Sequence, residues 1–156
     1  MKVASGRYKV SQILLFVVLF LPYGCENKDS LGFEFASPYI IEVIGQDYEW
    51  RIRYPGKDGI INTLDDILKE DNFVLPANTE IRLIFKSEDY LYFVELPELK
   101  KNGMAVPGLE SPLNLKTTSP MKIQFKGDQM CGFSHESLIK SVVVQDKKDF
   151  VAYLTD

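Results

Sequence analysis

Two side chains that bind soft metal ions lie close together near the C-terminal end of this 156-residue chain. Cys131 and His135 are separated by three residues, and His135 is the only histidine in the sequence. A thiolate and an imidazole at the two ends of one short loop can bind a single soft cation together. The alternative is a small buried thiol beside a surface imidazole, and the spacing alone does not decide between them.

The same pair could also be imagined as a hydrolytic site, with His135 as the base and Cys131 as the nucleophile. Such a site needs a third group that orients the imidazole, and four residues of one loop do not provide it. We therefore predict no catalytic residue in the chain itself.

The N-terminus has the pattern of an export signal. A basic start is followed by nine consecutive apolar residues at positions 13–21, far fewer than the roughly twenty that a membrane-spanning helix needs. We predict a signal peptide at residues 1–24 and a polar tether at residues 25–32. The Gly24-Cys25 junction resembles a bacterial lipobox, although Pro22 occupies the usual leucine position. Lipidation of Cys25 would make the protein an exported, membrane-anchored lipoprotein of a bacterial cell envelope.

Two alternatives remain for Cys25. The signal peptide could be an ordinary one that is cut nearby, which would leave Cys25 as a free or intermolecular thiol. Cys25 could also form a disulfide with Cys131, the only other cysteine in the sequence.

The charge of the chain restricts its partners. The formal net charge is −4, and residues 1–24 hold Lys2, Arg7 and Lys9 but no acid, so the remaining chain is more acidic still. Nucleic acid is therefore not expected as a partner. A basic protein, such as a soluble cytochrome, would be attracted.

From Phe33 onward the chain predicts an all-β domain. Short runs of aromatic and β-branched residues alternate with turn signals, which is typical of a β-sandwich or barrel. No helical period is long enough to predict a helix. The prolines and glycines between Pro97 and Pro120 predict a long surface connection. The strands are expected at residues 39–44, 48–54, 79–85, 90–96, 121–125 and 141–145.

Seven short motifs follow one another along residues 39–154. They are Trp50-x-x-x-Tyr54-Pro55, Gly56-x-Asp58-Gly59, Leu75-Pro76, Ser87-x-Asp89-Tyr90-Leu91-Tyr92, Ala105-Val106-Pro107-Gly108, Cys131-Gly132-x-x-His135 and Phe150-x-x-Tyr153. In this order they resemble the copper-binding (CuA-type) cupredoxin domain of cytochrome c oxidase subunit II. The resemblance implies a cupredoxin-like Greek-key β-sandwich or barrel over residues 33–156.

The resemblance also implies a copper ligand set. In that family a dinuclear copper centre is held by two bridging thiolates, two imidazoles, one thioether and one backbone carbonyl. Cys131 and His135 match the second cysteine and the second histidine. Gln129 matches the residue whose backbone carbonyl binds copper. Three of the six donors are therefore retained.

The other three donor positions carry different residues. Tyr92 stands at the first histidine, Gly127 at the first cysteine and Leu138 at the methionine. Met130 is the nearest thioether, but it falls on a non-ligand position whose side chain we expect to point into the core. A full dinuclear centre is not expected, and copper remains possible only with an incomplete ligand set.

These substitutions leave two functional hypotheses. The favoured one is a non-redox structural, accessory or binding module related to respiratory oxidases, anchored at a membrane surface and associated with oxidase-like membrane subunits or a c-type cytochrome. The alternative is a copper-binding electron-transfer subunit that accepts electrons from cytochrome c. Tyr48 occupies the position of the family's electron-entry tryptophan, which weakens the alternative.

Overall fold

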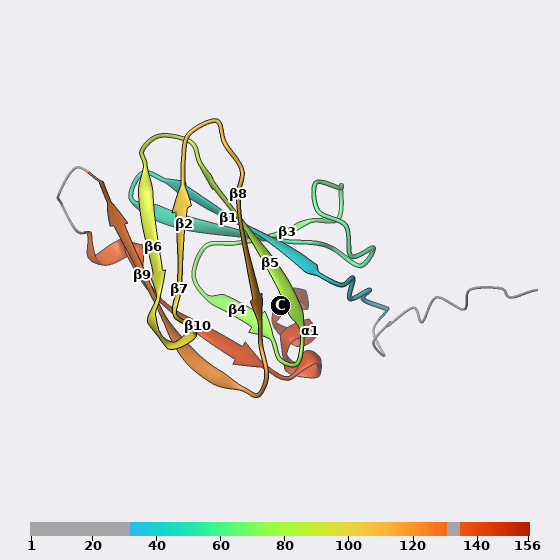
Figure 1. The fold of residues 1–156 in the computed structure, drawn as a ribbon. Coiled ribbons are helices and arrows are strands. Elements are labelled where there is room, and N and C mark those ends of the chain that lie inside the picture. The colour runs from blue at the N-terminus through green and yellow to red at the C-terminus, as the bar shows by residue number, and fades with distance from the viewer. Residues whose placement is uncertain (1–31, 131–134) are drawn as a thin grey trace, which may run out of the picture.

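The computed structural model describes residues 32–130 and 135–156, and Figure 1 shows them as two β-sheets that enclose one core. The predicted signal peptide and most of the tether, Cys25 included, lie outside the described residues. In chain order the elements are β1 (Tyr39–Gln46), β2 (Glu49–Tyr54), β3 (Ile67–Lys69), β4 (Phe73–Pro76), β5 (Glu80–Ser87), β6 (Tyr92–Leu96), the 3-10 helix η1 (Pro97–Leu99), β7 (Lys101–Ala105), β8 (Ser111–Lys116), β9 (Met121–Gln129), the 3-10 helix η2 (Glu136–Leu138), β10 (Ile139–Gln145) and α1 (Lys147–Thr155).

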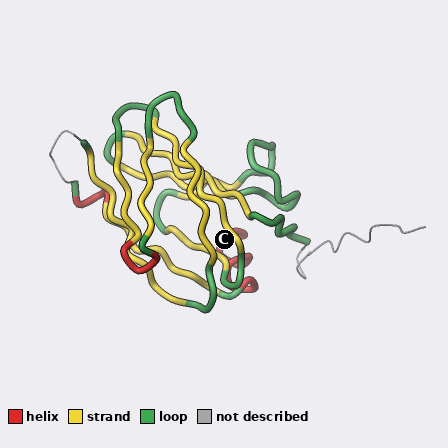
Figure 2. The backbone as a smooth tube through the Cα atoms, in the orientation of Figure 1, coloured by secondary structure: helices red, strands yellow, loops and turns green. Residues whose placement is uncertain are grey.

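Each sheet contains five strands. The first has the order β3-β2-β1-β5-β8, in which β1 and β5 run parallel and the other pairs run antiparallel. The second has the order β4-β10-β9-β6-β7, in which only β4 and β10 run parallel. Figure 2 shows the predominance of strand over helix, and the prediction of an all-β domain is confirmed.

Alternation of side chains places the core between the two sheets. Along β9, Ile123 and Phe125 are buried, whereas Lys122 and Gln124 face solvent, as the sequence predicted. Aromatic rings fill much of the interior. Phe125 packs edge-on against Trp50 from β2 and against Phe73 from β4, so residues from both sheets meet there.

The hydroxyl of Tyr54 connects the two sheets. It accepts a hydrogen bond from the Val74 backbone N–H and donates one to the Val74 carbonyl, both at 3.0 Å. Tyr54 belongs to β2 in the first sheet and Val74 to the edge strand β4 in the second. Because all these groups are buried, one phenol satisfies two backbone groups that have no access to water.

The prediction of a long surface connection between Pro97 and Pro120 is wrong. This segment contains η1 and two strands, β7, which pairs with β6, and β8, which pairs with β5. Pro112 is tolerated because β8 is an edge strand, in which a missing N–H costs little. Gly103 in β7 is required by packing, since a Cβ there would lie 2.6 Å from the Phe85 ring. The sequence predicts irregular backbone at both residues, whereas both lie in strands.

The C-terminal helix α1 was also not predicted. Its buried residues are Phe150, Val151 and Leu154, which form one apolar face against β4 and β10. Nine residues are too few for a helical period to stand out in sequence. The strands β3 and β4 were missed as well, because β3 has three residues and β4 ends at Pro76.

The strand directions give the domain two distinct ends. At the first, β1 ends, β6 begins and β9 ends; we call it the cluster end, and it includes residues 47–48, 88–91, 106–110 and 135. At the opposite end lie residues 32–38 and the loop 55–66; we call it the N-terminal end (Figure 1). None of the helices within the described ranges has the length and apolar character that a membrane crossing requires.

Candidate functional site

The strand pairing brings two of the predicted copper-ligand positions, Tyr92 and Gln129, together at the cluster end. β9 is longer than predicted and runs to Gln129, which lies directly opposite Tyr92, the first residue of β6. Gly127 lies two residues earlier on the same, inward face of β9, opposite Val94. Gln129 is 6% exposed and Tyr92 is fully buried.

Trp50 links Gly127 to Leu138. The indole Nε1 donates a hydrogen bond to the Leu138 carbonyl at 3.0 Å, and Leu138 itself is fully buried. A Cβ added to Gly127 would lie 2.7 Å from that carbonyl and 2.8 Å from Nε1. The Trp50 ring also packs against the Tyr92 ring, with 5.3 Å between centroids. The indole and a backbone carbonyl therefore occupy the space that a bridging thiolate at position 127 would need.

The Tyr92 hydroxyl is held by a carboxylate and a backbone N–H group. Its hydroxyl donates a hydrogen bond to Asp89 Oδ1 at 2.7 Å and accepts one from the Tyr48 backbone N–H at 3.3 Å. Burial and the bond to Asp89 raise the pKa of the Tyr92 phenol. Tyr92 is therefore a neutral hydrogen-bond donor at physiological pH, and a phenolate ligand is disfavoured.

Asp89 is the centre of a small polar network. Besides Tyr92, its carboxylate accepts hydrogen bonds at 2.6 Å from the backbone N–H groups of Asp47 and Tyr90. Partial burial raises the pKa of this carboxyl, but the bonds from Asp47, Tyr92 and Tyr90 outweigh it and lower the pKa overall. Asp89 thus joins the β1–β2 turn to the start of β6. This network was not predicted from the sequence. Asp89 stands only three positions before Tyr92, but Asp47, whose backbone N–H binds Asp89, is far away in the chain.

His135 lies against an aromatic stack at the surface of the same end. The centroid of its imidazole lies 3.9 Å from the centroid of the Tyr48 ring. Tyr48 in turn stacks on Tyr90, with 5.2 Å between the ring centroids. Tyr48 has a positive φ of 63°, which is uncommon for a residue with a side chain. The structure therefore places His135 beside Tyr48, the residue that the sequence comparison predicts at the family's electron-entry position.

Cys131 and Met130 are the other residues that were considered from the sequence as copper ligands. Cys131 lies outside the described residues. The expectation that Met130 points into the core is wrong, since 62% of this residue is exposed. The inward-facing neighbour is Gln129, because side chains alternate along the end of β9. Among the residues that the structure describes, no three His, Cys, Asp or Glu side chains form a group that could hold a metal ion.

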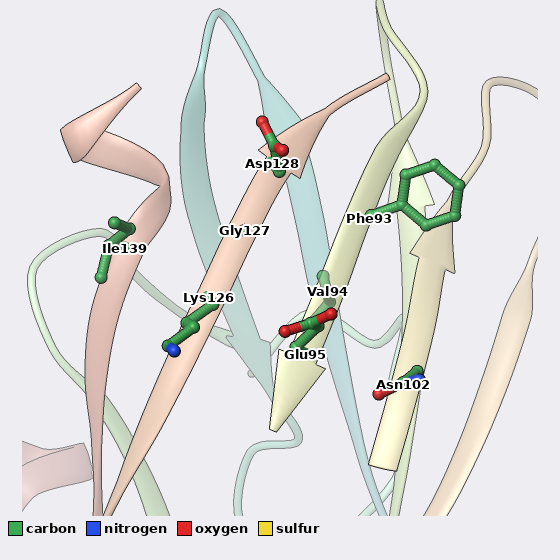
Figure 3. Close-up of a pocket in the computed structure, with 8 residues that line it drawn as sticks. All are labelled: Phe93, Val94, Glu95, Asn102, Lys126, Gly127, Asp128 and Ile139. Atoms are coloured by element: carbon green, nitrogen blue, oxygen red, sulfur yellow. The ribbon is translucent and has the colours of Figure 1, made fainter. Parts of the chain in front are cut away.

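A hollow of about 410 Å³ lies on the outer face of the second sheet (Figure 3). Phe93, Glu95, Lys126, Asp128 and Ile139 are among its lining residues. Phe93, Glu95, Lys126 and Asp128 alternate with the inward-facing residues of β6 and β9, so the sheet lies between these side chains and those of Tyr92 and Gln129. Gly127 also lines the hollow, whereas Tyr92 and Gln129 do not.

Replacement of Asp89 tests the network directly. We expect Asp89→Asn to lower the free energy of unfolding at pH 7 by about 1–2 kcal/mol, because it weakens several hydrogen bonds to a partly exposed carboxylate. The pKa of Asp89 is lowered in the folded state relative to an unfolded value of about 3.9. Its stabilisation is therefore present above about pH 4 and is lost as the pH falls through the folded pKa.

Urea unfolding at neutral and acidic pH measures this effect. The difference between wild type and Asp89→Asn should shrink below pH ~4, whereas the exposed control Asp128→Asn should show little difference at either pH. An equal loss of stability at both pH values would mean that the charge of Asp89 does not contribute.

The two curled sheets, with Tyr92, Gln129 and His135 at one end, define a cupredoxin-like domain. The resemblance to subunit II of cytochrome c oxidase is confirmed by comparison with known proteins. No protein-family model matches the chain. The alternative cytochrome c oxidase subunit 2 of Bradyrhizobium diazoefficiens is 24% identical over 136 residues, which cover 73% of this chain and 49% of that protein. The heme-copper oxidase subunit 2 of Aeropyrum pernix is 27% identical over 155 residues, which cover 94% and 62%.

Solved structures agree with this fold. The periplasmic domain of subunit II of cytochrome oxidase from Bradyrhizobium japonicum superposes with a TM-score of 0.62 at 19% identity, covering 77% of this chain and 93% of that one. Subunit II in a mixed disulfide with a thioredoxin-like protein gives a TM-score of 0.63 at 18% identity, covering 77% and 91%. The chain spans 49% and 62% of the lengths of the two curated relatives and nearly all of the solved periplasmic domains.

Proposed function

We propose that this protein is a membrane-anchored envelope lipoprotein whose subunit II-like domain has lost the dinuclear copper centre. It acts as a non-redox structural, accessory or binding module of an oxidase-like complex. In this proposal residues 1–24 are removed, Cys25 carries the lipid, residues 25–32 form the tether and residues 33–156 form the domain. The single observation that carries it is the hydrogen bond between Tyr92 and Asp89 at the first-histidine position.

The side chains at the other positions also favour a site without a dinuclear centre. A copper pair needs two thiolate bridges, and the space beside Gly127 is filled by Trp50 and the Leu138 carbonyl. Leu138 offers no donor atom in its side chain. The backbone carbonyl of Gln129 and the side chains of Cys131 and His135 are the only remaining members of the family's ligand set.

Partners are proposed from the names of the relatives. Subunit II of an oxidase is by name one part of an assembly, and oxidase-like membrane subunits are therefore the first candidates for this domain. A c-type cytochrome is the second, since the chain is acidic and would attract a basic protein. The periplasmic location of the solved domain supports export to the envelope of a bacterium.

The alternative function is copper-dependent electron transfer from cytochrome c. The location of His135 at the cluster end, next to Tyr48, is the observation that favours it. Cys131 and His135 would then hold copper with an incomplete ligand set.

A copper titration separates the two functions. We expect the purified protein to show no intense thiolate-to-copper absorption and to keep its melting temperature when a chelator is added. Its stability comes from buried apolar area, worth about 25 cal/mol per Å², and not from metal ligation. Stoichiometric copper uptake with strong absorption that disappears in Cys131→Ser would favour the electron-transfer function instead.

A further inference from the structure

The loop between β2 and β3 exposes aliphatic side chains at the N-terminal end of the domain. Ile60 is 61% exposed and Leu64 is fully exposed, and Leu68 in the short strand β3 is 46% exposed. Single exposed aliphatic residues are common on protein surfaces. Here the exposed residues belong to one short connection, which we call the aliphatic loop (residues 57–68).

The polar side chains of the aliphatic loop bind the loop itself. Asp58 accepts a hydrogen bond from the Ile60 backbone N–H at 2.9 Å, and Asp66 accepts one from the Asn62 backbone N–H at 2.8 Å. The Thr63 hydroxyl donates to Asp65 at 2.6 Å. Polar groups therefore stabilise the turns, while the aliphatic side chains are directed to the outside.

The loop is also fixed to the first sheet. Arg53 in β2 donates hydrogen bonds to Asn62 Oδ1 at 3.1 Å and to the buried carboxylate of Glu42 at 2.9 Å. Glu42 in turn accepts a hydrogen bond from the Asn62 amide at 3.2 Å and pairs with Lys86 at 2.6 Å. These bonds fix the loop that carries Ile60 and Leu64 to the first sheet.

The aliphatic loop lies beside the point where the chain enters the domain. The Glu34 backbone N–H donates to the Lys57 carbonyl at 3.1 Å. Gly59 has a positive φ of 67°, and a Cβ there would lie 2.7 Å from the Glu34 carbonyl oxygen, so glycine permits this close approach. In Figure 1 the loop and the first described segment, residues 32–38, lie on the same side of the domain.

We propose that the aliphatic loop contacts the lipid bilayer and inserts Leu64 and Ile60 into its interfacial region. This inference rests on the proposed anchoring of Cys25. Only residues 25–31 separate that lipid from the described domain, and seven residues reach about 25 Å at full extension. The tether therefore keeps the loop within reach of the bilayer at a high effective concentration.

The charge of the loop indicates which bilayer it should prefer. The loop contains three acids, Asp58, Asp65 and Asp66, and one base, Lys57, so it carries a negative charge. An anionic surface would repel the loop, because like charges repel each other within about a Debye length of such a surface. Insertion therefore depends on apolar contact and is favoured on zwitterionic lipid.

Quenching by brominated lipid tests this orientation. Leu64→Trp places an indole on the loop, and the matched control Leu109→Trp places one at a residue 62% exposed at the cluster end. Trp50 is 2% exposed and gives the same background in both variants. In phosphatidylcholine vesicles with brominated acyl chains, the lipidated Leu64→Trp protein should be quenched roughly threefold more than Leu109→Trp, because an interfacial segment sits about 5–10 Å deep.

A second arm separates this inference from the anchoring. A Cys25→Ser chain without residues 1–24, carrying an N-terminal histidine tag, is held on vesicles by a nickel-chelating lipid. Selective quenching of Leu64→Trp in this arm supports the loop contact even if Cys25 proves to carry no lipid. Equal quenching of both variants on vesicles that retain the protein overturns the inference. Quenching that appears only when membrane proteins are added would assign the loop to a protein partner and also overturn it.

Discussion

The double variant Tyr92→His, Leu138→Met is expected to bind one copper ion per chain and to acquire a strong thiolate-to-copper absorption. With Cys131 and His135, the two new side chains would complete two imidazoles, one thiolate and one weak thioether, which is the ligand set of a mononuclear blue-copper site. Leu138→Met conserves volume in a fully buried position. Asp89 already bonds the side chain at position 92 and can orient the introduced imidazole through its second nitrogen.

The gain in copper affinity should be large because the wild-type protein lacks the imidazole at position 92 and the thioether at position 138. We expect the double variant to bind copper at least about a hundredfold more tightly, the scale on which single ligands and their supporting bonds act. Each single variant serves as a control and should show a much weaker signal. A double variant that folds but shows no absorption at any copper concentration would mean that positions 92, 131, 135 and 138 do not converge.

Restoration of the dinuclear centre is harder, because it also requires Gly127→Cys. The obstacle is steric and not the backbone conformation, since Gly127 does not have a positive φ. The added Cβ would meet the Leu138 carbonyl and the Trp50 indole at less than 3 Å. We expect this substitution to cost about 1–3 kcal/mol, as is usual when a packed interior is overfilled.

The second large effect is expected at the other end of the protein. Cys25→Ser should move the protein from the membrane fraction to the soluble fraction, because it removes the acyl chains that we propose as the main anchor. Ile60 and Leu64 alone bury too little apolar area to retain the protein during washing. Fractionation with immunodetection and intact-mass measurement of the wild type give the two readouts.

Cys131→Ser is the matched control for this experiment, since it removes the other cysteine and should leave the protein in the membrane fraction. If Cys25→Ser remains bound to membranes and the wild-type mass shows no added lipid, the lipoprotein proposal is wrong.

Much of the fold could be predicted from local patterns. The alternation at Ile123 and Phe125 identified β9 and its inward face, because a half-buried strand repeats every two residues. The same strand could not be followed to Gln129, since glycine, aspartate and glutamine carry no strand signal. Their conformation is fixed by pairing with β6, and that partner is distant in sequence.

The candidate site, like the fold, could be predicted only in part from the sequence. The order of motifs predicts that Tyr92, Gly127, Gln129 and Leu138 stand at the family's donor positions. It could not show that Asp89 bonds the Tyr92 hydroxyl, because the carboxylate is positioned by hydrogen bonds from backbone groups on two different loops. Nor could it show that the Trp50 indole fills the space beside Gly127.

The pairing of β4 has a consequence for the order in which the protein can fold. This strand is at the edge of the second sheet and pairs only with β10, more than sixty residues later in the sequence. Contacts between such distant segments carry a high loop-closure cost and slow the folding reaction. A chain that is exported with its N-terminus first therefore cannot complete the second sheet until β10, near its C-terminal end, has also been exported. If Cys25 is anchored first, we expect the final folding step to take place at the membrane surface.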